Sequence, residues 1–117
     1  MPEIELTEPS EIFAAIQARS PLMHAQTRAA YIGKEVDWTL LAADGYEEAP
    51  GNARVMFHYR PHEVKYVAVR VPTADYPWLK SMRAGEAVQV RGRIAEIGNL
   101  NIELTEATLM QLVESAR

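Results

Sequence analysis

The 117-residue chain contains no cysteine, which excludes a disulfide framework, a thiolate metal site and a cysteine nucleophile. Its longest apolar runs, such as residues 39–43, are far shorter than the ~20 residues that a membrane-spanning helix needs. The acidic start MPEIELTEPSE lacks the basic and apolar regions of a secretory signal. We therefore expect a protein of the cytoplasm.

Sequence signatures of catalysis are missing as well. The chain has no glycine-rich phosphate loop, no G-x-S-x-G element and no H-E-x-x-H pair. The histidines are His24, His58 and His62, and the last two straddle a proline turn, where their spacing does not converge on a metal ion. We predict a protein that is not an enzyme and that needs no metal or other cofactor.

Charge is distributed unevenly along the chain. The net charge is −4, but residues 53–93 hold eight Lys or Arg and three acids, which makes this segment +5 and the remainder −9. Two explanations stay open for a basic middle between acidic flanks. It forms a basic binding face, or its charges only solvate the exposed sides of strands.

The first quarter of the chain has a helical pattern. Ile12, Phe13 and Ile16 form one apolar stripe, and Ser20-Pro21 both ends this helix and starts a second one. Gly33 is a suitable stop for the second helix. The apolar face of that second helix is weak and consists of Leu22, Met23, Ala29, Ala30 and Ile32.

From Lys34 onward the hydrophobic period changes from 3.6 to 2, which indicates strands. We expect five strands, at residues 34–43, 53–59, 64–71, 86–97 and 100–104. The short link between the second and third makes them a hairpin. Residues 44–52 and 72–85 have loop composition, with one helical turn near Trp78, and Gly92 marks a bulge or bend. The tail from Thr105 to Arg117 can begin by continuing the last strand, and it is expected to end in a short helix with Leu109, Leu112 and Val113 as its apolar face.

Three motifs resemble those of one known family. Residues 31–36 match Y-x-G-K-x-V, residues 85–94 match G-x-x-V-x-V-x-G-x-I, and residues 102–107 match I-x-L-x-x-A. Over residues 31–109 the chain is similar to OB-fold domains, within them to bacterial stand-alone domains related to the tRNA-anticodon-binding type. The resemblance implies a mainly β fold, a five-stranded Greek-key barrel. A helical extension at residues 1–33 would then pack on a barrel formed by residues 34–117.

The usual ligand face of an OB barrel lies on its second and third strands. Alternation directs Val55, Phe57, Val67 and Val69 inward, and Trp38 is also expected in the core. Trp78 and its neighbour Tyr76 either plug the end of the barrel or line a ligand site. The residues that we predict to bind ligand are Arg54, His58, Tyr66, Arg70, Arg91, Arg93 and Trp78.

The fold admits nucleic-acid, oligosaccharide and protein ligands alike, so the ligand stays open. We hypothesise a non-catalytic module that binds single-stranded DNA or RNA through the basic and aromatic residues of this face. The alternative is a protein–protein interaction or regulatory module without nucleic-acid binding. Its partner or self-association surface would consist of Ile12, Phe13 and Ile16, or of Leu109, Leu112 and Val113.

Overall fold

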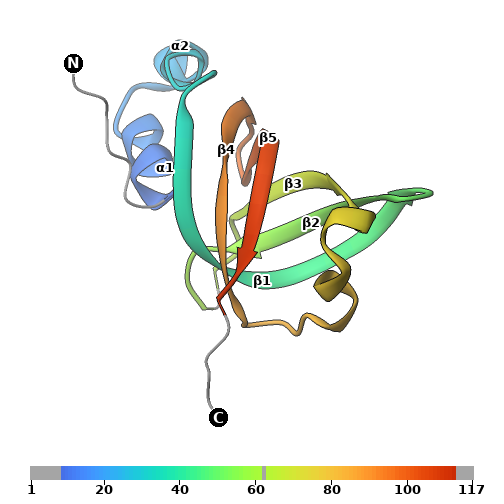
Figure 1. Cartoon of the computed structure of the whole chain (residues 1–117). Helices are drawn as coiled ribbons and strands as arrows, with labels where there is room; N and C mark the ends of the chain where they lie inside the picture. The colour runs from blue at the N-terminus through green and yellow to red at the C-terminus, as the bar shows by residue number, and fades with distance from the viewer. Residues whose placement is uncertain (1–8, 62, 113–117) are drawn as a thin grey trace.

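The computed structural model describes residues 9–61 and 63–112. Five strands close into a barrel in the order β1-β2-β3-β5-β4 (Figure 1). Strands β3 and β5 run parallel, and the other neighbours are antiparallel. The strands are β1 (Glu35–Ala49), β2 (Asn52–His58), β3 (Tyr66–Pro72), β4 (Ala87–Ile97) and β5 (Asn101–Gln111). The expected mainly β barrel with helices at its N-terminal side is therefore confirmed.

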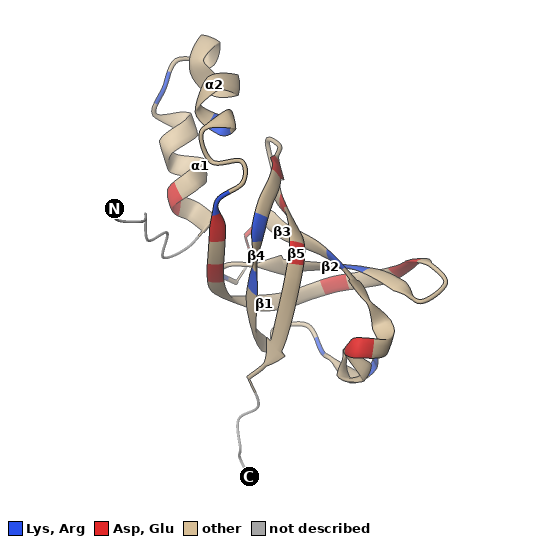
Figure 2. Ribbon diagram, turned by 45° about the horizontal axis from the view of Figure 1, so that its top comes forward, with Lys and Arg blue, Asp and Glu red and all other residues tan. Residues whose placement is uncertain are grey.

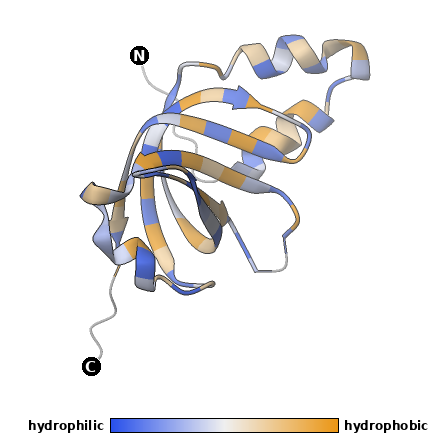
Figure 3. Cartoon of the chain, turned by 90° about the vertical axis from the view of Figure 1, so that its right-hand side faces the viewer, coloured by the Kyte–Doolittle hydropathy of each residue, from blue (hydrophilic) through white to orange (hydrophobic). Residues whose placement is uncertain are grey.

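Alternation of apolar and polar residues builds the core of this barrel. Orange and blue positions follow one another along the strands in Figure 3, and the apolar ones are buried. Trp38 is 1% exposed, as expected for a core residue. The predicted β2–β3 hairpin is present, with Val55 opposite Val69. The two hairpin strands therefore present one apolar face to the interior and one mixed face to solvent.

Strand β1 is longer than the sequence suggested. Residues 44–49, which we expected in a loop, pair with β2 through a register that places Tyr46 opposite Arg54. Gly51, with a φ of 80°, forms the tight turn that lets the hairpin continue to its tip. Backbone pairing with β2 therefore prevails over the turn-like composition of this segment.

Strand β5 also extends past its predicted end. We expected the tail from Thr105 to end in a short helix with Leu109 and Leu112 on its apolar face, but residues 105–111 continue the strand and pair with β4 as far as Gln111 opposite Val88. Leu109 lies in the core opposite Val90. Barrel closure explains the difference, because β4 needs a partner along its whole length. Val113 lies outside the described residues.

The N-terminal helices differ in how they meet the barrel. Helix α1 (Pro9–Gln17) buries Ile12, Phe13 and Ile16 in the core cluster. These three side chains are therefore not available as the partner surface that we considered. The short helices η1 (Pro21–Met23) and α2 (His24–Ala29) bury no residue. Their expected apolar face is uncovered, and Leu22 is 93% exposed.

The connection from β3 to β4 crosses one end of the barrel (Figure 1). It contains two short 3-10 helices, η2 (Thr73–Asp75) and η3 (Pro77–Ser81). Tyr76 and Trp78 meet edge to face, with ring centroids 6.1 Å apart, and both pack against the core. Among the described residues, no helix is long and apolar enough to cross a membrane.

Candidate ligand-binding face of the barrel

The structure brings three of the predicted residues together on the solvent side of β2 and β3. Arg54 on β2 lies directly opposite Arg70 on β3, and Tyr66 is on the same side of β3 as Arg70. The neighbouring strands complete this surface. We call it the outer face, and it consists of Tyr46, Glu48, Arg54, Met56, Tyr66, Ala68, Arg70 and Glu103.

A shared carboxylate separates the two opposed arginines. Like charges directly opposite one another destabilise a strand pair, so this arrangement needs an anion between them. Glu103 of β5 provides it: its Oε2 accepts a hydrogen bond from Nη2 of Arg54. Its Oε1 lies 3.6 Å from Nη1 of Arg70. Asn101 also donates to Glu103, at 2.7 Å. The carboxylate is thus held from three sides.

A second carboxylate from the β1–β2 hairpin completes the network. Arg70 donates through Nε and Nη2 to the two oxygens of Glu48, at 2.7 and 3.2 Å. These hydrogen bonds hold the pKa of Glu48 below its ordinary value of 4.5 and raise the pKa of Arg70. The outer face therefore pairs two arginines with two carboxylates and carries no net charge from them.

Arg54 is the buried centre of this network. Its side chain and that of Glu103 are each 13% exposed. Burial alone would lower the pKa of Arg54. The hydrogen bond to Glu103, the hydroxyl groups of Tyr66 and Tyr46 and the charge of Glu103 together raise it instead. Arg54 is therefore a fixed cation whose orientation is set by its surroundings.

Two tyrosines flank Arg54. Tyr46 is its ladder partner on β1 and is 51% exposed, and Tyr66 is half-buried at the start of β3. Sequence reasoning missed Tyr46, because the surrounding DGYEEAPGN was assigned to a loop. The available signal was Tyr46 itself, a residue type that favours strands, at the start of that segment. The face thus offers two aromatic rings beside a neutralised arginine pair.

Arg91 and Arg93 do not join this face. Both lie on β4, which β1 separates from β2 and β5 separates from β3. Figure 2 shows basic positions on β4 beside acidic positions on β1. Arg91 pairs with Asp37 at 3.1 Å, and Arg93 pairs with Glu35 at 2.9 Å. The pKa of Asp37 is lowered by hydrogen bonds from Gln89 and then Arg91. The predicted basic residues therefore occupy two separate surfaces.

The remaining predicted residues have local roles in the structure. His58 lies half-buried at the end of β2, where its Nδ1 is 3.2 Å from the carbonyl oxygen of Lys65. Trp78 is partly buried and packs against the core from the β3–β4 connection. Residues 9–61 and 63–112 contain no group of three or more His, Asp or Glu side chains that could hold a metal ion.

Comparison with known proteins extends this description. No known protein family matches the chain, and no curated protein matches it in sequence. Among solved structures, a similar one is the crystal structure of a protein from Klebsiella pneumoniae that is provisionally named a nucleic acid-binding lipoprotein. The two share 12% sequence identity with a TM-score of 0.64, and the match covers 90% of each chain. At this identity the likeness concerns the fold alone, and with the closed five-stranded topology it shows that the chain has an OB-like fold.

Proposed function

We propose that this protein is a non-catalytic module that binds single-stranded nucleic acid on its outer face. The observation that carries the proposal is the pair of tyrosines, Tyr46 and Tyr66, beside Arg54 on strands β1 to β3. This is the surface on which OB barrels bind oligonucleotides. Aromatic rings serve there as stacking platforms for bases.

Two further findings support the proposal. The structural neighbour from Klebsiella pneumoniae carries a nucleic acid-binding name, although that name describes the neighbour only. The motifs in residues 31–36, 85–94 and 102–107 are similar to those of tRNA-anticodon-binding-like OB domains. We propose that the chain is related to those domains, and that its fold and its class of ligand derive from this relationship.

Pairing of the arginines leads us to expect that stacking supplies most of the affinity. Each phosphate neutralised on a single strand contributes about −0.7 to the slope of log Kobs against log salt, so four free arginines would give about −3. Because Arg54, Arg70, Arg91 and Arg93 are all paired with carboxylates, we expect a slope no steeper than about −1.5. A shallow salt dependence thus distinguishes this face from an open basic groove.

Fluorescence anisotropy with labelled oligothymidylate and oligouridylate of about twelve nucleotides tests the proposal. Titrations at about 50 and 200 mM salt give the affinity and its salt slope. We expect Tyr66→Ala to weaken binding by about 5- to 150-fold, the equivalent of one lost base stack, and Tyr46→Ala to act similarly.

Two control variants make this result specific. Tyr66→Phe keeps the ring and is expected to keep most of the affinity. Leu22→Ala changes a residue that is exposed on η1, away from the outer face, and is expected to change nothing. Undetectable binding of the wild type at the lower salt, or equal binding by Tyr66→Ala and wild type, would refute the proposal.

A further inference from the structure

The two arginines of the outer face differ in how far solvent reaches them. The side chain of Arg54 is 13% exposed, whereas that of Arg70 is 58% exposed. Arg70 donates through Nε and Nη2 to the two oxygens of Glu48, and its Nη1 lies 3.6 Å from Oε1 of Glu103. Arg70 is therefore the arginine of this face that a ligand can reach, and one edge of its guanidinium group is held by Glu48.

The edge that Glu48 holds is the one that binds phosphate best. Nε and Nη2 of an arginine form two parallel donors that match two oxygens of a carboxylate or of a phosphate equally well. The two hydrogen bonds to Glu48, at 2.7 and 3.2 Å, have this two-pronged form. The carboxylate thus occupies the position in which a phosphate would bind Arg70.

The backbone of β1 is irregular at Glu48. The ladder with β2 passes from Glu47 opposite Ala53 to Ala49 opposite Asn52, so Glu48 is the extra residue of a bulge close to the hairpin tip. Such bulges commonly change the direction of a side chain next to a site. Because β2 lies between β1 and β3, the ion pair to the arginine on β3 crosses the solvent side of β2. The pair therefore lies over the middle strand of the outer face.

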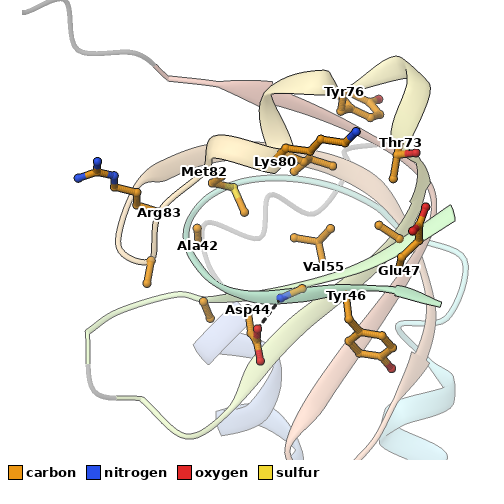
Figure 4. A pocket seen from close by; sticks show the side chains of 15 residues that line it. Ala42, Asp44, Tyr46, Glu47, Val55, Thr73, Tyr76, Lys80, Met82 and Arg83 are labelled. Carbon is orange, nitrogen blue, oxygen red and sulfur yellow. Dashed lines mark hydrogen bonds between the residues drawn. The ribbon is translucent and has the colours of Figure 1, made fainter. Parts of the chain in front are cut away.

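The neighbouring carboxylate has a different position. Glu47 accepts a hydrogen bond from Gly51 N at 3.0 Å. It lines a pocket at the end of the barrel, from which the ring of Tyr46 points away (Figure 4). Since Tyr46 belongs to the outer face, the carboxylates of Glu47 and Glu48 lie on different sides of β1. The chain thus offers a matched control one residue away.

We propose that Glu48 is an internal competitor of the nucleic-acid backbone, holding Arg70 in place of a phosphate of the bound strand. This inference rests on the proposed function of the outer face. A phosphate that took Arg70 would have to displace Glu48 and would then face its negative charge, and like charges repel. Glu48 therefore lowers the affinity for the phosphate backbone, and binding depends more on the bases that stack on the tyrosines.

The variant Glu48→Gln tests this role, in the oligothymidylate titrations at about 50 and 200 mM salt. Glutamine keeps the length of the side chain but removes the charge, and Glu103 still orients Arg70 through Nη1. One additional phosphate contact makes the salt slope steeper by about 0.7. We therefore expect Glu48→Gln to bind about eightfold more tightly than the wild type at 50 mM salt and about threefold more tightly at 200 mM.

Two controls separate this contact from a general change in charge. Glu47→Gln removes the same charge from the adjacent residue and is expected to bind within about twofold of the wild type. In an Arg70→Ala background, Glu48→Gln has no arginine to release. There we expect it to change the affinity by no more than about twofold and to leave the salt slope unchanged.

The same titrations distinguish failure of this inference from failure of the proposed function. Suppose that the wild type binds and Tyr66→Ala weakens it, but Glu48→Gln gains no more than Glu47→Gln does, or gains equally without Arg70. The inference is then overturned and the proposed function stands. Undetectable binding by the wild type and by Glu48→Gln at the lower salt would overturn both. Binding by Glu48→Gln alone would support the competitor role and refute the function for the unaltered protein.

Discussion

At the scale of single residues, the outer face depends on one carboxylate. Glu103 lies between Arg54 and Arg70, which would otherwise face each other as like charges. Arg54 and Glu103 are both largely buried, and removing one member of such a pair leaves an uncompensated charge. The organisation of the face therefore depends more on Glu103 than on any exposed ion pair.

We predict that Glu103→Gln lowers the free energy of unfolding by about 1–3 kcal/mol. Glutamine keeps the shape of the side chain but removes the charge that compensates the two arginines. Urea denaturation measures the change. Glu35→Gln, which removes an exposed partner of Arg93, is the control and should cost less than about 0.5 kcal/mol. Equal costs for the two variants would show that Glu103 is only a surface partner.

The carboxylate of Glu48 gives a prediction for pH dependence. Its pKa in the folded protein is below the ordinary 4.5, because Arg70 donates to it. A group with a lowered folded pKa stabilises the protein above its unfolded pKa and loses that contribution as pH falls through the folded value. Stability should therefore fall as the pH drops below about 4.5 and through the lowered folded pKa of Glu48, and Glu48→Gln should show a shallower fall. Urea titrations at each pH measure this, and parallel curves for variant and wild type would contradict it.

At the scale of elements, the sequence predicts the central residues of each strand well and the ends of the strands poorly. Val88, Val90 and Ile94 alternate with polar residues, so β4 could be recognised from its own residues. The ends of β1 and β5 depend on partners that are distant in the chain. Residues 44–49 are a strand because β2 returns beside them, and local composition contains no information about that return.

Gly92 is a residue whose predicted effect on its strand is present in the structure. The predicted irregularity is present, since the β4–β5 register shifts between Arg91 and Arg93. A Cβ at Gly92 would meet Leu104 Cβ and the carbonyl oxygen of Thr105, both at 3.2 Å. Strand β5 therefore crosses β4 more closely here than a larger residue allows.

We predict that Gly92→Ala lowers the free energy of unfolding by about 1–3 kcal/mol, because backbone of β5 must shift to admit the methyl group. Chemical denaturation checks the value. Ala95→Val, at an exposed position of the same strand, should change stability by no more than about 0.5 kcal/mol. An unchanged free energy of unfolding in Gly92→Ala would contradict this prediction, because it would show that β5 accommodates the methyl group without destabilising the fold.

At the scale of the whole molecule, the charge pattern of the sequence has a three-dimensional explanation. The basic segment 53–93 contributes Arg54, Arg70, Arg91 and Arg93, and their partners come from the acidic flanks on β1 and β5. Counting charged residues along the sequence therefore could not reveal that these arginines are neutralised, because such a count ignores ion pairs between strands.

The fold class could be predicted because motifs and alternation act within single strands, whereas the candidate site is assembled from several. Arg54, Tyr66 and Arg70 were found because neighbouring strands of a hairpin share a face. Tyr46 and Glu103 come from the unexpected part of β1 and from β5. Their contribution depends on barrel closure, which joins β3 to β5 in parallel.

The most direct test of the central claim is an NMR titration of the isotope-labelled protein with oligothymidylate at low salt. We predict that chemical-shift changes concentrate on the outer face, at Tyr46, Arg54, Tyr66 and Ala68, and leave the arginines of β4 and the residues of η3 unchanged. Changes confined to β4 or to η3, or no changes at all, would contradict the assignment of this face as a nucleic-acid site.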